Sequence, residues 1–161
     1  MKTTVRIQEA DFSLEDEYQH LRGITRHIGA VITFTGLVRE VEHLTDAHDI
    51  QSMTLQHYPG MTEKLLQEII NEAGERWSLI AVTVIHRVGL LLPNDQIVFV
   101  GVASAHRQAA FSAAEFIMDY LKTRATFWKS IDQNGEKHWV ESKETDQDAA
   151  SRWKSQCSPK Q

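Results

Sequence analysis

Cysteine is nearly absent from this sequence, and its scarcity limits both stabilisation and chemistry. The only cysteine in 161 residues is Cys157, close to the C-terminus. One cysteine cannot form an intrachain disulfide, so we expect a reducing compartment, the cytoplasm. The sequence also lacks a cysteine pair or a His-x-x-x-His pair as zinc ligands, a glycine-rich phosphate loop and a dinucleotide fingerprint. We therefore expect neither a metal nor a bound cofactor.

Long apolar segments and an excess of positive charge are also missing. The most apolar stretch, Ile97 to Ala105, is too short to cross a bilayer, and the acidic N-terminus does not resemble a secretory signal. Lys plus Arg is 17 and Asp plus Glu is 22, for a net charge of −5. We expect no membrane association and no general nucleic-acid binding, so any anion site has to be a local basic cluster.

The apolar pattern predicts an α+β fold with a mixed or largely antiparallel sheet. β-branched runs and alternation indicate strands at 4–8, 29–38, 53–57, 80–88, 97–103 and 137–143. Three- and four-residue apolar spacing indicates helices at 61–77 and 104–123. We expect a short helical or irregular segment at 13–27, a polar loop at 40–49, and a short helix after Thr145 that Trp153 docks. Residues 1–153 are interpreted as one domain and 154–161 as a frayed tail.

The pair His106-Arg107 lies where a strand gives way to a helix. If the helix begins near Ser104, both side chains stand on its first turn, beside unpaired N–H groups and the positive end of the dipole. A cation is unfavourable there, which points to a bound anion such as a phosphate or carboxylate. A surface arginine paired with a nearby acid is the alternative.

A second cluster of basic and aromatic residues lies at the C-terminal end of the same predicted helix. The run from Tyr120 to Lys129 holds three cations and three aromatic residues in ten positions. Lys122 and Arg124 suit a helix C-terminus electrostatically, and spacing alone favours this interpretation. The alternative is an aromatic-walled anion pocket, in which crowding by other cations would lower the pKa of a lysine. Arg39 and Lys143 stand alone at strand ends, and His86 alternates onto an apolar face, as a core or interface histidine would.

Five segments, in order, resemble a known family. They are GAVITFTGLVR at 29–39, LQHYPGMTEKLLQEI at 55–69, the stretch from Val82 to Lys129 with SAHR, MDYLKTRA and FWK, WVESKETD at 139–146, and RW at 152–153. The similarity spans about residues 5–153. The chain resembles the MoaE family, the large, catalytic subunits of molybdopterin synthase.

The resemblance implies an α/β hammerhead fold with an additional antiparallel β subdomain. It implies a sulfurtransferase that inserts two sulfurs, as a dithiolene, into cyclic pyranopterin monophosphate (precursor Z). The sulfur would come from a small ubiquitin-like carrier subunit whose C-terminal Gly-Gly is a thiocarboxylate, since the only thiol of this chain lies outside every matched segment. A homodimer of large subunits, and a heterotetramer with the carrier, are also implied.

Site residues follow from the same resemblance. Substrate binding is expected of Leu37, Val38, Arg39, His106, Arg107, Lys122, Lys129 and Lys143, and Lys122 and Lys129 are expected to be catalytic. We expect the basic members to converge in one cleft, either within one copy or with a contribution from a neighbouring copy. Leu37, Thr126 and Lys143 depart from the residues common in the family. The role of Lys122 stays open between nucleophile, acid–base group and electrostatic stabiliser.

Two other functions compete with this interpretation. A non-catalytic module that binds a ubiquitin-like carrier, or scaffolds cofactor assembly, would need the same surface without turnover. RNA or nucleotide binding through the basic and aromatic run at 120–129 is disfavoured by the acidic balance.

Overall fold

The computed structural model describes residues 1–39, 52–133, 136–140, 148 and 150–153. Its centre is a four-stranded sheet in the order β1-β4-β6-β2. The strands are β1 (Lys2–Gln8), β4 (Leu79–Arg87), β6 (Gln96–Ser104) and β2 (Ala30–Leu37). β1 pairs parallel with β4, and the other pairs are antiparallel. The sheet is therefore mixed, and the predicted α+β class is confirmed.

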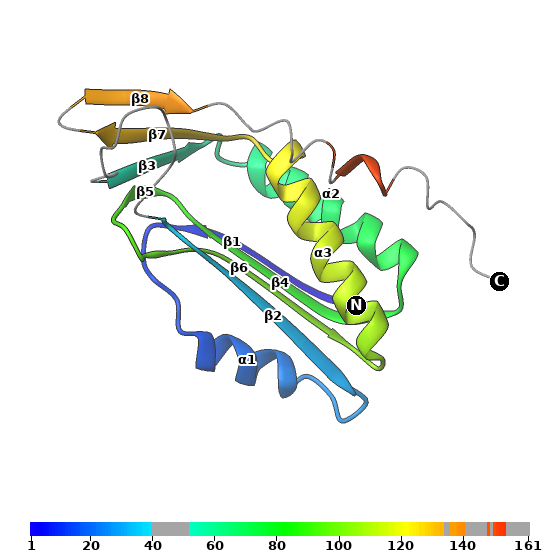
Figure 1. Ribbon diagram of the computed structural model, residues 1–161. Coiled ribbons are helices and arrows are strands. Elements are labelled where there is room, and N and C mark those ends of the chain that lie inside the picture. Colours follow the sequence, from blue (N-terminus) through cyan, green and yellow to red (C-terminus); the bar gives the residue numbers. More distant parts are fainter. Residues whose placement is uncertain (40–51, 134–135, 141–147, 149, 154–161) are drawn as a thin grey trace.

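Helices cover both faces of this sheet (Figure 1). α1 (Leu14–Arg22) lies on one face, and α2 (Met61–Arg76) and α3 (Arg107–Arg124) lie on the other. Alternation along the central strands supplies both cores: Val84 and Val100 pack towards α2 and α3, whereas Ile85 and Phe99 pack with Leu21 of α1. The two central strands are apolar on both sides because each side meets a helix.

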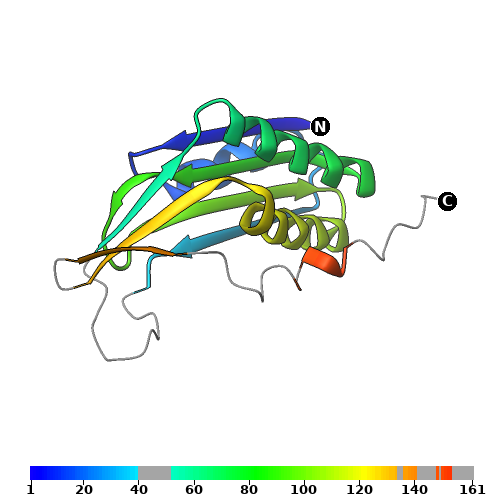
Figure 2. The same ribbon diagram turned by 90° about the horizontal axis from the view of Figure 1, so that it is seen from above.

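A second sheet adjoins one end of the first, as Figure 2 shows from above. Its order is β5-β3-β7-β8, with all pairs antiparallel. The strands are β5 (Gly89–Leu91), β3 (Ser52–His57), β7 (Phe127–Gln133) and β8 (Glu136–Val140). A small core of Val38, Met53, Leu55, Leu91 and Ile131 fills its inner side. The additional antiparallel unit that the resemblance implied is present.

Two sequence predictions need correction, and one strand was not predicted. The run at 120–129 is not one helix end, because its last residues begin β7, and the three-residue strand β5 was not predicted at all. α3 begins at Arg107 rather than at Ser104, since Ser104 still pairs with Ala30 in the sheet. The strand predicted at 137–143 is confirmed as β8 within the described residues, and residues 141–143 lie outside them. The loop at 40–49, Thr145 and the tail at 154–161 lie outside the described residues.

The C-terminal segment docks on the helices as predicted. Trp153 is buried, its indole packs edge-on against Trp77 and Phe116, and its Nε1 donates to the carboxylate of Asp119 at 2.7 Å. Among the described residues, no helix is long and apolar enough to cross a bilayer.

Candidate functional site

An open pocket of about 720 Å³ lies at the start of α3. It is lined by Gly29, Ala105, His106, Arg107, Gln108, Phe111 and Ser112. His106 is the N-cap residue and Arg107 the first helical residue, and both are exposed. The N–H groups of the first helical turn have no partner inside the helix, and no acidic residue stands in this turn. The pocket therefore offers a positive dipole end, a guanidinium and an imidazole to an anion.

Gly29 shapes the floor of this pocket. Its N–H donates to the Ser104 carbonyl at 3.0 Å, and a Cβ at this position would lie 2.3 Å from the Ala105 carbonyl oxygen. The chain entering β2 is thereby pressed against the residues that lead into α3. Only glycine permits this approach, because the obstacle is backbone.

The two lysines stand at the opposite end of α3. Lys122 is exposed on its last turn, and Lys129 is half-buried on β7. Alternation along β7 puts Lys129 on the same face as Phe127 and Ile131, the face that packs on the small core. Both lysines therefore lie where the second sheet meets the helices.

Arg39 follows β2 at this same end. Its neighbour Val38 is buried and bonded through its backbone to the turn before β6: the Val38 N–H donates to the Asp95 carbonyl at 2.9 Å, and the Asn94 N–H donates to the Val38 carbonyl at 2.8 Å. Leu37 is half-exposed and Arg39 exposed. The backbone of 37–39 is thus held firmly while the arginine side chain reaches outwards.

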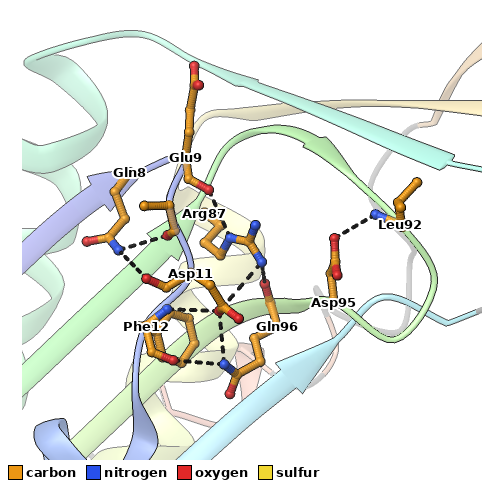
Figure 3. A network of polar contacts seen from close by, with 9 residues as sticks. Gln8, Glu9, Asp11, Phe12, Arg87, Leu92, Asp95 and Gln96 are labelled. Atoms are coloured by element: carbon orange, nitrogen blue, oxygen red, sulfur yellow. Dashed lines mark hydrogen bonds and ion pairs between the residues drawn. The ribbon is translucent and has the colours of Figure 1, made fainter.

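Arg87 anchors that turn (Figure 3). Its Nε donates to the Glu9 carbonyl and its Nη1 to the Gln96 carbonyl, each at 3.0 Å. Gln96 is the register partner of Leu37, and the Asp95 carboxylate accepts from the Leu92 N–H at 2.8 Å. The guanidinium therefore ties β1 to the start of β6, against which Leu37 and Val38 are placed.

One copy of the chain does not bring the predicted basic residues together. β2 runs antiparallel to β6, and α3 turns back along β6, so β2 and α3 run in the same direction (Figure 1). Gly29, His106 and Arg107 mark their common start, and Arg39 and Lys122 their common end. From Arg107 to Lys122 the helix axis advances about 22 Å at 1.5 Å per residue. Lys143 lies outside the described residues.

Two features of this region were missed at the sequence level. Phe111 lines the pocket and is 60% exposed. An aromatic residue on the solvent-facing side of a predicted helix is the sequence feature that could have indicated it. Gly29 was read only as a strand boundary. Within the described residues, no group of three or more His, Cys, Asp or Glu side chains is placed to hold a metal.

Known proteins match this chain over most of its length. A family model described as MoaE protein matches residues 7–124. The molybdopterin synthase catalytic subunit of Yersinia pestis is 56% identical over 151 residues, which are 94% of this chain and 97% of that protein. The corresponding subunit of Escherichia coli (strain K12) is 53% identical over 152 residues, 94% of this chain and 99% of that protein. The solved structure of a molybdopterin biosynthesis MoaE protein from Burkholderia ambifaria has a TM-score of 0.81 and 47% identity, and covers 96% of this chain and 99% of that one. The chain belongs to the MoaE family.

Proposed function

We propose that this chain is the catalytic subunit of a molybdopterin synthase, a sulfurtransferase of molybdenum cofactor biosynthesis. It would transfer two sulfurs from the thiocarboxylate of a small ubiquitin-like carrier subunit to precursor Z and so form the molybdopterin dithiolene. The observation that carries the proposal is the pocket at the start of α3, where His106 and Arg107 stand beside the helix N-terminus of an acidic chain. The relatives named molybdopterin synthase catalytic subunit support it.

The reaction brings two anions into one site. Precursor Z carries a phosphate, and the carrier tail ends in a thiocarboxylate. Arg107 offers forked N–H donors and His106 a ring donor to phosphate oxygens, with the helix N-terminus adding backbone donors. Lys122 and Lys129 are point charges on flexible stems, suited to follow a group whose charge changes as sulfur leaves the acyl carbon. We assign Lys122 to proton movement or charge stabilisation in that step.

Two copies are needed to assemble this set. Since one copy keeps Arg107 and Lys122 about 22 Å apart along the helix, a phosphate held at the first cannot place a pterin of ordinary size at the second. We propose that each site takes Lys122, Lys129 and Arg39 from one copy and His106 and Arg107 from its dimer partner. With a carrier on each large subunit, the assembly is a heterotetramer. We also propose the cytoplasm as its compartment, in keeping with the single cysteine.

Reconstitution tests the proposed function. The purified chain is mixed with thiocarboxylated carrier and precursor Z, and molybdopterin is measured beside the variants Lys122→Ala and Lys2→Ala. The second variant removes an exposed lysine of β1, at the other edge of the central sheet from β2. We expect molybdopterin from the wild type and Lys2→Ala, and none from folded Lys122→Ala. Carrier binding by the wild type without turnover would instead identify a non-catalytic module.

A further inference from the structure

A single buried hydroxyl ties α2 to the turn that separates the two lysines. Thr62, in the first turn of α2, is fully buried, and its Oγ1 lies 3.2 Å from the Thr126 carbonyl oxygen and 3.3 Å from Thr126 Oγ1. It also lies 3.1 Å from the Tyr58 carbonyl oxygen and accepts from the Tyr58 N–H at 3.2 Å. The contact joins residues 64 positions apart in the sequence.

We propose that Thr62 is a positioning residue that sets Lys129 relative to Lys122 by fixing the turn at Thr126; this inference rests on the proposed function. Lys122 is four residues before Thr126, and Lys129 is three residues after it. The chain between the two lysines passes through this one turn, and Lys129 is held on its far side by the pairing of β7 with β3, where it lies opposite Leu55. In the role we assign, Thr62 acts through the turn and does not contact the substrate.

Thr126 lies between two segments that are held by their own contacts, α3 before it and the β3–β7 pairing that begins at Phe127 after it. Before it, the Arg124 guanidinium pairs with the Glu72 carboxylate of α2 at 2.7 Å, and after it the Phe127 ring stacks on His86 at 3.9 Å between centroids. Arg124 and Glu72 are both partly exposed, so that pair alone is a weak restraint. Thr126 is exposed, and its contact with the buried Thr62 hydroxyl connects the turn directly to α2.

The backbone of the turn makes a sharp test available. The Phe127 N–H donates to the Ala125 carbonyl at 3.1 Å, the pattern of a γ-turn centred on Thr126. Thr126 is not among the described residues with positive φ, so the turn is of the inverse kind, with φ near the value that proline imposes. Ala125 has φ −75° and ψ 131°, the extended conformation that a following proline requires. Proline at 126 therefore fits and stiffens the turn, whereas glycine loosens it.

The first experiment compares Thr126→Pro with Thr126→Gly. Both variants lose the same hydroxyl and keep the Tyr58 and Thr126 carbonyl oxygens beside Thr62, but they change the freedom of the turn in opposite directions. With saturating carrier, we expect Thr126→Pro to keep kcat within about twofold of wild type and Thr126→Gly to lose about tenfold in kcat, with little change in the KM for precursor Z. Equal kcat values for the two folded variants would overturn the proposal. A wild type without turnover would instead refute the proposed function.

The second experiment removes the tie from its buried side. We expect Thr62→Val to lower kcat, Thr62→Ser to retain it, and the double variant Thr62→Val with Thr126→Pro to recover most of the loss. Thr123→Val is the matched control, because the Thr123 hydroxyl donates to the Asp119 carbonyl within α3 and spans no second element. A purely structural role predicts a lower denaturation midpoint without a change in kcat, or no recovery in the double variant; either result would overturn the proposal. If Thr62→Val does not fold, the kcat comparison of Thr126→Pro with Thr126→Gly tests the proposal alone.

Discussion

The imidazole of His86 stacks on the ring of Phe127, with centroids 3.9 Å apart and planes inclined by 19°. His86 is the last residue but one of β4 in the central sheet and Phe127 is the first of β7 in the second, so this contact joins the two sheets. The His86 side chain is buried. Its Nδ1 lies 2.8 Å from the Arg87 carbonyl oxygen and donates a hydrogen bond to it, because a carbonyl oxygen can only accept. Burial lowers the pKa of His86 from 6.5 to about 4, with a smaller lowering from His57, against the opposing effect of the bond to Arg87.

This pKa makes stability depend on pH. The folded chain binds the His86 proton only near pH 4, whereas the unfolded chain binds it near pH 6.5, so stability falls as the pH drops below 6.5 and the loss is complete below about pH 4. His86→Phe keeps a ring for Phe127 and removes the titration. Between pH 7.5 and pH 5 we expect the wild type to lose about 2 kcal/mol of unfolding free energy relative to the variant. Urea unfolding at both pH values measures this, and a difference that does not vary with pH would contradict it.

Trp153 is expected to hold the C-terminal segment against the two helices. Besides its packing on Trp77 and Phe116, its carbonyl accepts from Arg76 Nη1 at 3.0 Å. Trp153→Ala should lower the unfolding free energy by about 3–5 kcal/mol, the usual loss for a large buried aromatic side chain. Trp153→Phe should lose less, because an aromatic ring remains to pack against Trp77 and Phe116. A loss below about 1 kcal/mol for the alanine variant would mean that the segment does not dock in solution.

The main elements were predictable from local pattern. The run GAVITFTGLV became β2 because β-branched residues favour strands, and the apolar spacing from Met61 became α2 because burial of one helix face imposes that period. β7 was not predictable in this way, since FWKSIDQ has no clean alternation and its strand form depends on pairing with β3 and β8. β5 has three residues, too few to show any period. Pairing with neighbouring strands therefore determined the strand conformation of both β5 and β7.

The position of the proposed site in space could not be predicted from the sequence. Arg107 and Lys122 were both assigned to one helix, and a straight helix of that length already separates them by about 22 Å. The predicted helix was therefore compatible with convergence only through a neighbouring copy. The role of Thr62 had no local signal, because its partner Thr126 is 64 residues away.

Arg87 is expected to control the placement of Arg39. Arg87→Met keeps the apolar stem but removes the bonds to the Glu9 and Gln96 carbonyls, which the turn beside Val38 depends on. We expect a loss of about 2–3 kcal/mol in unfolding free energy and a raised KM for precursor Z. Arg26→Met, at an exposed position, is the control and should change stability by less than about 0.5 kcal/mol. An unchanged KM in folded Arg87→Met would dissociate this network from the site.

Mixing two inactive variants tests whether the site is shared between copies. If Lys122 of one copy works with Arg107 of its partner, a heterodimer of Lys122→Ala and Arg107→Ala has one site with both residues intact and one with neither. Random assembly of equal amounts should then restore about one quarter of wild-type activity, although each variant alone is inactive. The control is the double variant mixed equally with wild type: a shared site leaves about one quarter of the activity, whereas a site within one copy leaves about one half. No recovery in the first mixture together with one half in the second would place the whole site in one chain, against the separation that α3 imposes on its two ends.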